Sequence, residues 1–320
     1  MSSAFLSVVI PLFNKEHTVE RAIASVLAQV HTNFELIVVD DGSTDSSASV
    51  AERFDDPRLR IVRQHNSGVS AARNSGVQRA RSDYVCFLDA DDEWHPEFLT
   101  RICGLIQLNG TAGLYSCRYE IVGADGTKRL GRLSLKTSHR GEVGDFFYHY
   151  RRSRSLLNSS SVCVSKRALA ESGGFPVGEA VGEDVYVWLT VARHFRVMFD
   201  ARVSSTIHQD AENRTVDRLP VATPYYLRAF LSDRPHQQVN PQLIKLLQSY
   251  VVIYAAASVV REAREKAQEY AELIRPHSTI HYLLCKALFY CPPSLVLTYR
   301  RLRVGRRKIE YYINSVARAR

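Results

Sequence analysis

Residues 35–45 read Glu-Leu-Ile-Val-Val-Asp-Asp-Gly-Ser-Thr-Asp, an apolar run followed by an acidic one. Its first half is a short aliphatic run, rich in β-branched residues, without polar alternation. Such a run is typical of a strand that is buried on both faces of a parallel sheet. Its second half is rich in Asp, Gly and Ser, which favour turns. The stretch therefore predicts a buried strand that ends in an acidic turn.

Strands and helices alternate on both sides of this stretch as far as residue 110. Upstream, residues 7–13 predict another buried strand, and residues 19–27 predict a helix with apolar residues at i, i+3, i+4 and i+7. Strands separated by helices predict right-handed βαβ units and a parallel sheet. Downstream, we expect helices at 46–54 and 69–80, strands at 59–63 and 84–88, and a helix that begins near Pro96.

After residue 110 the pattern changes. The turn Ala124-Asp125-Gly126 separates two strand-like runs, which predicts a hairpin of residues 114–122 and 128–135. We further expect strands at 158–165 and 203–207, a helix at 183–194, and helical structure from residue 220 that includes a long helix at 242–274.

The composition is that of a globular protein whose basic residues lie at one end. Hydrophobic residues make up 45% of the 320 residues and charged residues 23%, which suffices for a sizeable core. Residues 261–320 hold thirteen Lys and Arg against five Glu, a difference of +8 within a net charge of +9. The first 260 residues are therefore close to neutral, which argues against a nucleic-acid-binding body.

Nothing in the sequence predicts a secretory or membrane-spanning segment. The apolar run at residues 5–13 has no basic region before it, and no uninterrupted apolar stretch reaches the roughly 20 residues that a spanning helix needs. The six cysteines show no metal-ligand spacing, so we expect reduced thiols in the core. These features together favour a cytoplasmic protein.

Polar residues gather where the predicted parallel strands end. Ligands of open parallel sheets bind beyond the carboxyl ends of the strands, and Asp40-Asp41 and Asp89-Ala90-Asp91-Asp92 both lie there. Asp40 and Asp41 could instead build a turn and cap a helix, and residues 89–92 could cap the helix near Pro96. Three carboxylates in four residues repel one another unless a cation neutralises them, which favours Mg²⁺ or Mn²⁺.

Six segments resemble motifs of the family 2 glycosyltransferases, in that family's order. The resemblance implies the GT-A fold, an α/β architecture with a Rossmann-like, mostly parallel sheet, here followed by a C-terminal helical extension. The segments are Ser-Val-Val-Ile-Pro-Leu-Phe-Asn (7–14), Val-Asp-Asp-Gly-Ser-Thr-Asp (39–45), Gly-Val-Ser-Ala-Ala-Arg-Asn-Ser-Gly (68–76), Phe-Leu-Asp-Ala-Asp-Asp (87–92), Ser-Gly-Gly-Phe-Pro (172–176) and Gly-Glu-Asp-Val-Tyr-Val-Trp-Leu (182–189).

The resemblance also implies an activity and a division of the chain. We expect an inverting enzyme of the bacterial type that moves a sugar from a nucleotide-diphosphate sugar to a hydroxyl of a glycan or lipid-linked acceptor in surface polysaccharide biosynthesis. UDP is the default nucleotide. Residues 1–219 would form the catalytic domain, with a nucleotide-binding half (1–110) and an acceptor half (111–219), and residues 220–320 a basic helical region.

Roles for single residues follow from the same resemblance. Asp41 is expected to bind the base, and Asp89 to contact the ribose or a divalent metal (Mn²⁺ or Mg²⁺) that Asp91 ligates directly. In some similar enzymes a histidine in the region of His208 completes the metal or diphosphate site. A lone histidine can equally be structural. The remaining expected nucleotide contacts are Pro11, Phe13, Asn14 and Arg73.

Asp184 is the expected general base. Glycosyl transfer needs a group that takes the proton of the acceptor hydroxyl, and a carboxylate at a helix start can do so. The alternative is that Asp184 only complements the helix dipole. Glu183 competes for the role of base, and Trp188, one turn on, would either shape the acceptor pocket or belong to the core.

The C-terminal region predicts contact with an anionic membrane surface. Residues 281–298 are rich in Leu and Phe, and Arg300, Arg301, Arg303, Arg306, Arg307 and Lys308 follow them. Apolar helical faces beside a polybasic run suit the cytoplasmic face of a membrane. The alternative is a helical appendage that packs on the catalytic domain or on a partner.

Other functions fit the sequence less well. A dinucleotide-dependent oxidoreductase requires a Gly-rich turn after the first strand, where this chain has Pro11-Leu12-Phe13-Asn14. A non-catalytic protein that binds a nucleotide sugar or an assembly partner with the same fold remains the alternative. Binding of nucleic acid by the basic tail predicts strongly salt-dependent retention on DNA.

Overall fold

The computed structural model describes residues 4–153, 156–210, 223–232, 240–260 and 263–296. These residues divide into two compact units, which are described separately. The first consists of residues 1–179 and 183–211, and the second of Ala180–Gly182 and residues 212–320. The domain boundary expected at residue 219 falls outside the described residues and stays a prediction.

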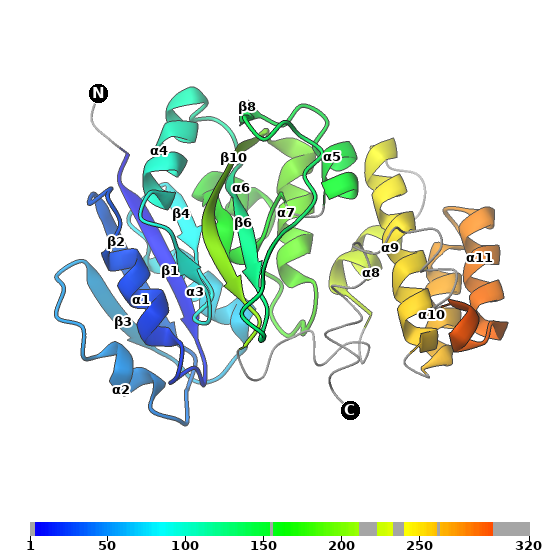
Figure 1. The fold of residues 1–320 in the computed structure, drawn as a ribbon, viewed down its shortest axis with the longest axis horizontal. Coiled ribbons are helices and arrows are strands. Elements are labelled where there is room, and N and C mark those ends of the chain that lie inside the picture. The colour runs from blue at the N-terminus through cyan, green and yellow to red at the C-terminus, as the bar shows by residue number, and fades with distance from the viewer. Residues whose placement is uncertain (1–3, 154–155, 211–222, 233–239, 261–262, 297–320) are drawn as a thin grey trace. The chain divides into compact units, whose positions relative to one another are not determined.

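A mixed sheet forms the centre of the first unit (Figure 1). Its first four strands are all parallel, as the alternation of strands and helices predicts. Beyond them the pairing is mixed, with β6 parallel to β10 and both antiparallel to other neighbours. The order is β3 (Leu59–Arg63), β2 (Phe34–Asp40), β1 (Leu6–Leu12), β4 (Tyr84–Phe87), β9 (Val162–Ser165), β6 (Leu114–Val122), β10 (Val197–His208) and β5 (Glu93–Trp94), with β7 (Lys128–Leu130) on β6 and β8 (Arg140–Glu142) on β10.

Strands β1 and β2 are buried at every position, which shows that both faces of the sheet are covered there. On one face the even-numbered residues of β1 share a core with α1 (Val19–Leu27) and α4 (Phe98–Leu108). On the other face α3 (Val69–Arg79) approaches β1 so closely that a Cβ at Gly76 would lie 2.4 Å from Val9. The first unit also contains α2 (Ser47–Ala51), α5 (Phe146–Ser153), α6 (Lys166–Glu171) and α7 (Glu183–His194).

The structure corrects three of the expected elements. The second strand of the hairpin ends at Leu130 instead of residue 135, and β10 is longer than the expected strand at 203–207. Residues 159–161 form a 3-10 turn before β9, because Asn158 and Ser161 cap it reciprocally through their side chains. The polar run therefore makes a turn where the sequence pattern indicates a strand.

The second unit is helical, as expected. It contains α8 (Tyr225–Ser232), α9 (Pro241–Val260), α10 (Arg264–Ile274) and α11 (Thr279–Tyr290). The single long helix expected at 242–274 is instead α9 and α10, with a non-helical Ala263 before α10. Four aromatic rings pack in succession through its core, at centroid separations of 5.5, 6.2 and 5.9 Å: Tyr226, Tyr250, Tyr254 and Tyr270.

Among the described helices, α9 has the length and composition to cross a membrane, although Lys245 and Gln248 interrupt its apolar sequence. Half of its most apolar window is buried within the structure, as in a core helix of a globular protein. All six cysteines are free, and all but Cys291 are buried, which confirms the expected reduced thiols. The basic run at 300–308 lies outside the described residues.

Candidate active site

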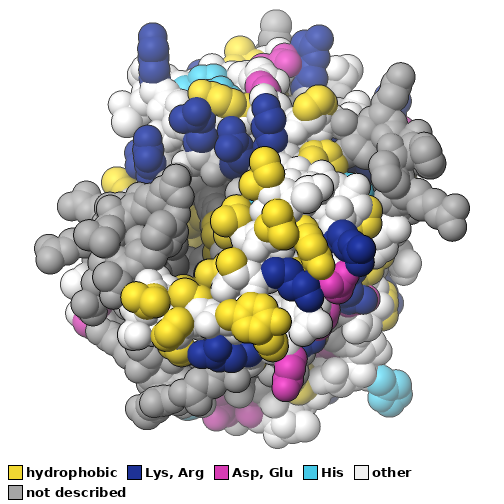
Figure 2. Space-filling view, turned by 90° about the vertical axis from the view of Figure 1, so that its right-hand side faces the viewer, with side chains coloured by type: hydrophobic (Ala, Val, Ile, Leu, Met, Phe, Trp, Pro, Cys, Tyr) yellow, Lys and Arg dark blue, Asp and Glu magenta, His cyan; other side chains and the backbone are white. Residues whose placement is uncertain are grey.

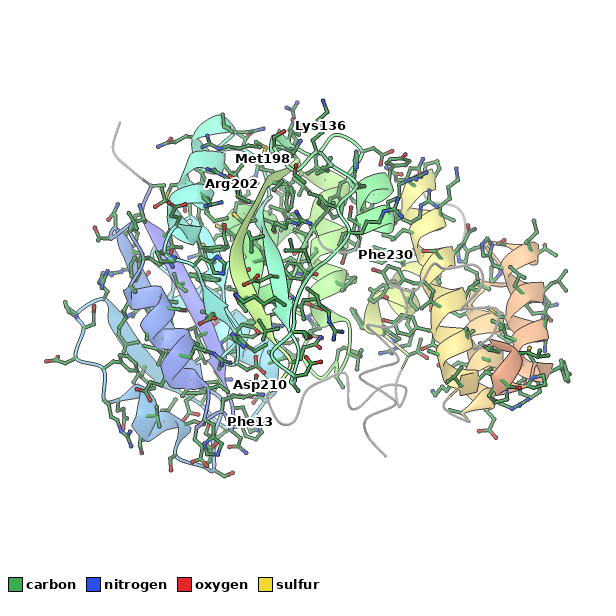
Figure 3. The ribbon with its side chains drawn as sticks, in the orientation of Figure 1. Phe13, Lys136, Met198, Arg202, Asp210 and Phe230 are labelled. Atoms are coloured by element: carbon green, nitrogen blue, oxygen red, sulfur yellow. The ribbon has the colours of Figure 1, made fainter. Side chains whose placement is uncertain are left out.

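The polar strand ends of the first unit lie at one end of the sheet. Figure 3 shows Phe13, which follows β1, and Asp210, which follows β10, near this end, whereas Met198 and Arg202 lie near the other. Because β1, β2 and β4 are parallel, their carboxyl ends come together there. The predicted site residues that follow these strands therefore share one edge.

Asp41 organises the loop that leads into α3. Its buried carboxylate accepts hydrogen bonds from the backbone N–H groups of Ser67 (2.9 Å) and Gly68 (2.8 Å) and from the Gln64 side chain (2.8 Å). Asp40 accepts the Ser43 N–H at 3.0 Å, which is the turn-forming role considered from the sequence. The role of Asp41 in binding a base stays a prediction.

The residues at the carboxyl end of β1 and just after it differ in exposure. Pro11 is buried beside Val39, whereas the Phe13 ring is 41% exposed. Asn14 has a φ of 50°, which is uncommon for a residue other than glycine, and its side chain exchanges hydrogen bonds with Thr44. Asn14 thus joins the loops after β1 and β2, and Phe13 has an exposed side chain whose contact with a nucleotide stays a prediction.

Arg73 joins two acidic segments that are distant in sequence. It lies on α3 and is 3% exposed. Its Nη2 donates to Asp89 Oδ1 at 2.8 Å and its Nη1 to Glu183 Oε1 at 3.0 Å. Burial disfavours its charge, but these carboxylates outweigh that effect and raise the pKa of Arg73. Arg73 therefore stays charged and holds the strand-end loop against the start of α7.

Glu183 and Asp184 are neighbours in different environments. Glu183 is buried, and burial together with the charge of Asp184 raises its pKa to about 7, although Arg73 opposes the shift. Asp184 is partly exposed, and its Oδ2 accepts a hydrogen bond from Ser159 Oγ at 3.0 Å. Of the two competitors for the role of base, Asp184 is thus the more accessible.

The acidic loop after β4 carries its own counter-charges. The Asp91 Oδ2 atom lies 2.9 Å from Lys15 Nζ, and Asp89 pairs with Arg73. Burial raises the pKa of Asp89 against the opposing effect of Arg73, and burial with the charges of Asp91 and Asp89 raises that of Asp92 well above its usual range. Neighbouring cations and burial thus lessen the repulsion expected among these three carboxylates.

Asp92 is a tether. Its buried carboxylate accepts a hydrogen bond from Ser160 Oγ and another from the His208 backbone N–H at 2.9 Å. The same Ser160 oxygen accepts the Asp89 N–H at 3.1 Å. The 3-10 turn, the acidic loop and the end of β10 are therefore joined through one carboxylate and one hydroxyl.

His208 and Trp188 occupy positions that bear on their expected roles. The His208 Nε2 atom lies 3.1 Å from Glu93 Oε1, and the structure does not bring its ring together with Asp89 and Asp91 as a three-ligand group. Trp188 is 1% exposed and packs edge-on against Phe175, at 5.6 Å between centroids. The structure therefore supports the core alternative for Trp188, and a ligand role for His208 stays a prediction.

Three residues of this edge were absent from the predicted site. Lys15 follows Asn14 directly, so its place after a strand end was a signal that could have found it. Ser159 and Ser160 belong to a polar run between strand-like segments, but the sequence does not show that they contact Asp184 and Asp92. These hydroxyls orient acids that are far from them in sequence.

The donor set at this edge suits a hard cation held largely by a substrate. No group of three or more His, Cys, Asp and Glu that could hold a metal occurs among the described residues. Mg²⁺ is commonly bound by one or two carboxylates together with substrate phosphates. The partly exposed Asp91 side chain, with Asp89 two residues away, meets that smaller requirement.

A family model for glycosyl transferase family 2 matches residues 7–172, more than half of the chain. The chain belongs to glycosyl transferase family 2. This assignment confirms the resemblance carried by the sequence motifs, and it makes the protein a glycosyltransferase. The match includes the strand-end residues and Ser159 and Ser160, and it ends before Glu183 and Asp184.

Curated relatives support the same assignment. This glycosyltransferase is 28% identical over 199 residues to UDP-Glc:alpha-D-GlcNAc-diphosphoundecaprenol beta-1,3-glucosyltransferase WfgD from Escherichia coli. The aligned region covers 60% of this chain and 72% of the relative. The matches to two further curated glycosyltransferases span 35% and 27% of their lengths.

Solved structures confirm the fold. TarS of S. aureus in complex with UDP-GlcNAc superposes with a TM-score of 0.68 at 15% identity, covering 93% of this chain and 92% of that one. The mannosyltransferase PcManGT from Pyrobaculum calidifontis, in complex with GDP-Man and Mn²⁺, gives a TM-score of 0.60 at 18% identity, covering 99% and 87%. At these identities the likeness establishes the fold alone.

Proposed function

We propose that this glycosyltransferase moves a sugar from a nucleoside-diphosphate donor, with UDP as the default nucleotide, to a hydroxyl of a glycan or lipid-linked acceptor in surface polysaccharide synthesis. The name of the WfgD relative, with its UDP-Glc donor and diphosphoundecaprenol-linked acceptor, supports this choice. The sugar nucleotides bound to TarS and PcManGT support a nucleotide-sugar donor in general.

The environment of Asp184 carries the proposal. A base must reach solvent and substrate, and Asp184 is the partly exposed member of its acidic pair. The Ser159 hydroxyl occupies one of its oxygens at 3.0 Å and so fixes the carboxylate orientation. Glu183 is buried against Arg73 and serves as a positioning residue.

The proposed reaction is a single displacement. Asp184 takes the proton of the acceptor hydroxyl while the acceptor oxygen forms a bond to the anomeric carbon. The bond from that carbon to the donor phosphate oxygen breaks on the opposite face, and the nucleoside diphosphate leaves with the electron pair. Attack opposite the leaving group inverts the anomeric configuration.

Asp41, Asn14 and the exposed Phe13 ring are proposed to bind the nucleotide, with Pro11 beneath it and Arg73 fixing Asp89 beside the ribose. Asp91, with Asp89, would hold Mn²⁺ or Mg²⁺. Such a cation, when bound, stabilises the negative charge that develops on the diphosphate. The Lys15 ammonium group lies 2.9 Å from Asp91 Oδ2, so it would compete with a cation for that carboxylate oxygen.

A cytoplasmic location, with the basic C-terminal region at the inner face of a membrane, is part of the proposal. The concentration of thirteen Lys and Arg in residues 261–320 supports it. We also propose a catalytic domain of residues 1–219 and a helical region of residues 220–320, because the family motifs end at residue 189 and the sequence pattern is helical from residue 220.

A panel of sugar nucleotides tests the proposal. We expect one or more donors to raise the melting temperature of the full chain more with Mn²⁺ than without it, and to release nucleoside diphosphate slowly by hydrolysis. Proton NMR of the released sugar or glycoside should show the inverted anomer. Donor binding without any release would favour the non-catalytic alternative, and a retained anomer would overturn the single displacement.

A further inference from the structure

Helix α11 carries an apolar stripe on its exposed side. Large hydrophobic residues recur at helical spacing and are largely exposed: Ile280 (70%), Leu283 (57%), Leu284 (48%) and Tyr290 (76%). Ala287, which completes the spacing, is also exposed. Positions i, i+3, i+4, i+7 and i+10 form one face of a helix.

The other side of α11 already has a partner within the helical unit. Cys285 is the buried residue of the helix, and α11 packs on α9 and α10. A surface helix of a globular protein normally turns its apolar stripe inward. Here a second apolar face remains outward, and Leu295, which follows the helix in sequence, is also 57% exposed.

The chain around this stripe is basic. In sequence, no Asp or Glu occurs from residue 273 to residue 309, whereas this stretch contains eight Lys and Arg, six of which lie outside the described residues. Two of them, Arg275 and Lys286, lie beside the ring of Tyr282 on α11, and both also approach Glu272. Figure 2 shows hydrophobic side chains gathered on the face turned to the viewer, with Lys and Arg side chains beside them.

We propose that the exposed face of α11 docks on the surface of an anionic lipid bilayer. An apolar stripe flanked by cations can place its aliphatic side chains among the acyl chains and its cations among anionic headgroups. A second copy of the chain would bring like charges together at this face. A nucleic acid would gain little from Ile280, Leu283 and Leu284, because, of the large side chains named in this stripe, only Tyr290 could stack on a base.

This docking surface rests on the proposed membrane location and specifies which face of the protein would make the contact. A lipid-linked acceptor presents its sugar at the headgroup level, so docking by α11 would hold the enzyme at the surface where such an acceptor lies. The docking itself does not depend on the identity of the donor. It can therefore be tested separately from sugar transfer.

Vesicle flotation of the full chain is the test. We expect binding to vesicles of equal parts phosphatidylcholine and phosphatidylglycerol, weaker binding to phosphatidylcholine alone, and a loss with rising salt. The double variant Leu283→Glu/Leu284→Glu should bind the anionic vesicles at least about tenfold more weakly. The milder pair Leu283→Ala/Leu284→Ala should fall between that variant and the parent.

Controls separate docking from folding and from catalysis. Leu108→Glu/Val177→Glu places two acids at comparably exposed apolar positions of the first unit and should bind like the parent. Donor hydrolysis should be unchanged in all variants. A parent that does not float with anionic vesicles, or Leu283/Leu284 variants that float as well as the parent, would overturn the proposal. A parent dimer that the Glu variant dissociates would assign this face to a second copy instead.

Discussion

The acidic loop at residues 89–92 and the acidic pair at residues 183–184 both place neighbouring carboxylates in different environments. In each, one carboxylate is buried with a raised pKa and serves as a tether: Asp92 to Ser160 and His208, and Glu183 to Arg73. Its neighbour in sequence, Asp91 or Asp184, is partly exposed. Burial thus separates adjacent acids into one that maintains the structure and one that remains available for chemistry.

The two regions differ in what holds the available acid. Asp91 faces the Lys15 ammonium, whereas Asp184 faces the Ser159 hydroxyl. An ammonium group beside Asp91 neutralises a carboxylate that a metal ion could bind in its place. A neutral hydroxyl beside Asp184 adds no positive charge that would oppose the uptake of a proton. The comparison therefore supports the proposal that the first region binds the cation and the second accepts the proton.

The largest expected effect is the loss of activity in Asp184→Asn. An amide cannot accept the proton, so we expect release of nucleoside diphosphate to fall by about a hundred- to ten-thousand-fold. Glu183→Gln, the matched change at the buried neighbour, should lose much less. Steady-state rates with the best donor of the panel measure both, and equal losses would remove the distinction between the two acids.

Asp92→Ala should give the largest loss of stability. It leaves the His208 N–H and the Ser160 hydroxyl without their acceptor, and we expect the free energy of unfolding to fall by about 2–4 kcal/mol. Asp91→Ala removes a partly exposed ion pair and should cost below about 1 kcal/mol. Urea unfolding at neutral pH compares them, and similar costs would show that Asp92 is no tether.

The raised pKa of Glu183 predicts a pH dependence of stability. Folding raises its pKa from 4.5 to about 7, so its contribution is fully present below pH 4.5 and is lost as the pH rises through about 7. Glu183→Gln does not titrate. The difference in unfolding free energy between parent and variant should therefore shift against the parent between pH 5 and pH 8, at about 1.4 kcal/mol per pKa unit at most. A difference that is flat with pH would contradict the assigned burial.

The smallest expected effect concerns Lys15. Removing its charge with Lys15→Met frees Asp91 of a competing cation, and we expect Mn²⁺ to bind about two- to fivefold more tightly without any donor present. Electron paramagnetic resonance of free Mn²⁺ reports this directly. Lys128→Met, which removes a lysine from Glu120 elsewhere, is the matched control and should change nothing. An unchanged affinity in Lys15→Met would place the metal away from Asp91.

Local patterns of the sequence predicted most of the nucleotide-binding half. The buried strands β1 and β2 and the amphipathic helix α1 appear close to their predicted bounds, because apolar periodicity reflects burial directly. The strand-end acids also fall at one edge, since parallel pairing requires it. Long-range pairing was not predictable in this way: the two partners of Arg73 lie 16 and 110 residues from it.

Breaks in regular structure were also hard to predict. Residues around 261–266 are rich in Ala, Arg, Glu and Lys, which favour helix, so the pattern indicated one helix where α9 and α10 are separate. Ala263 instead bonds its N–H to the Ser258 carbonyl and leaves the helical conformation. The favourable composition of this segment therefore did not reveal the break at Ala263.

If the helical unit is exchanged between related enzymes, three residues that lie far upstream of it in sequence must be exchanged with it. Ala180–Gly182 belong to that unit, and Gly182, with a φ of 80°, would bring a Cβ within 2.8 Å of the Tyr226 ring. The Val181 carbonyl also accepts the Tyr225 N–H at 2.9 Å. A chimera joined only after residue 211 would place a foreign helix against this tripeptide, which immediately precedes Glu183 and Asp184 in sequence. A folded chimera therefore needs two regions taken from the same parent, the tripeptide at residues 180–182 and the helices after residue 211.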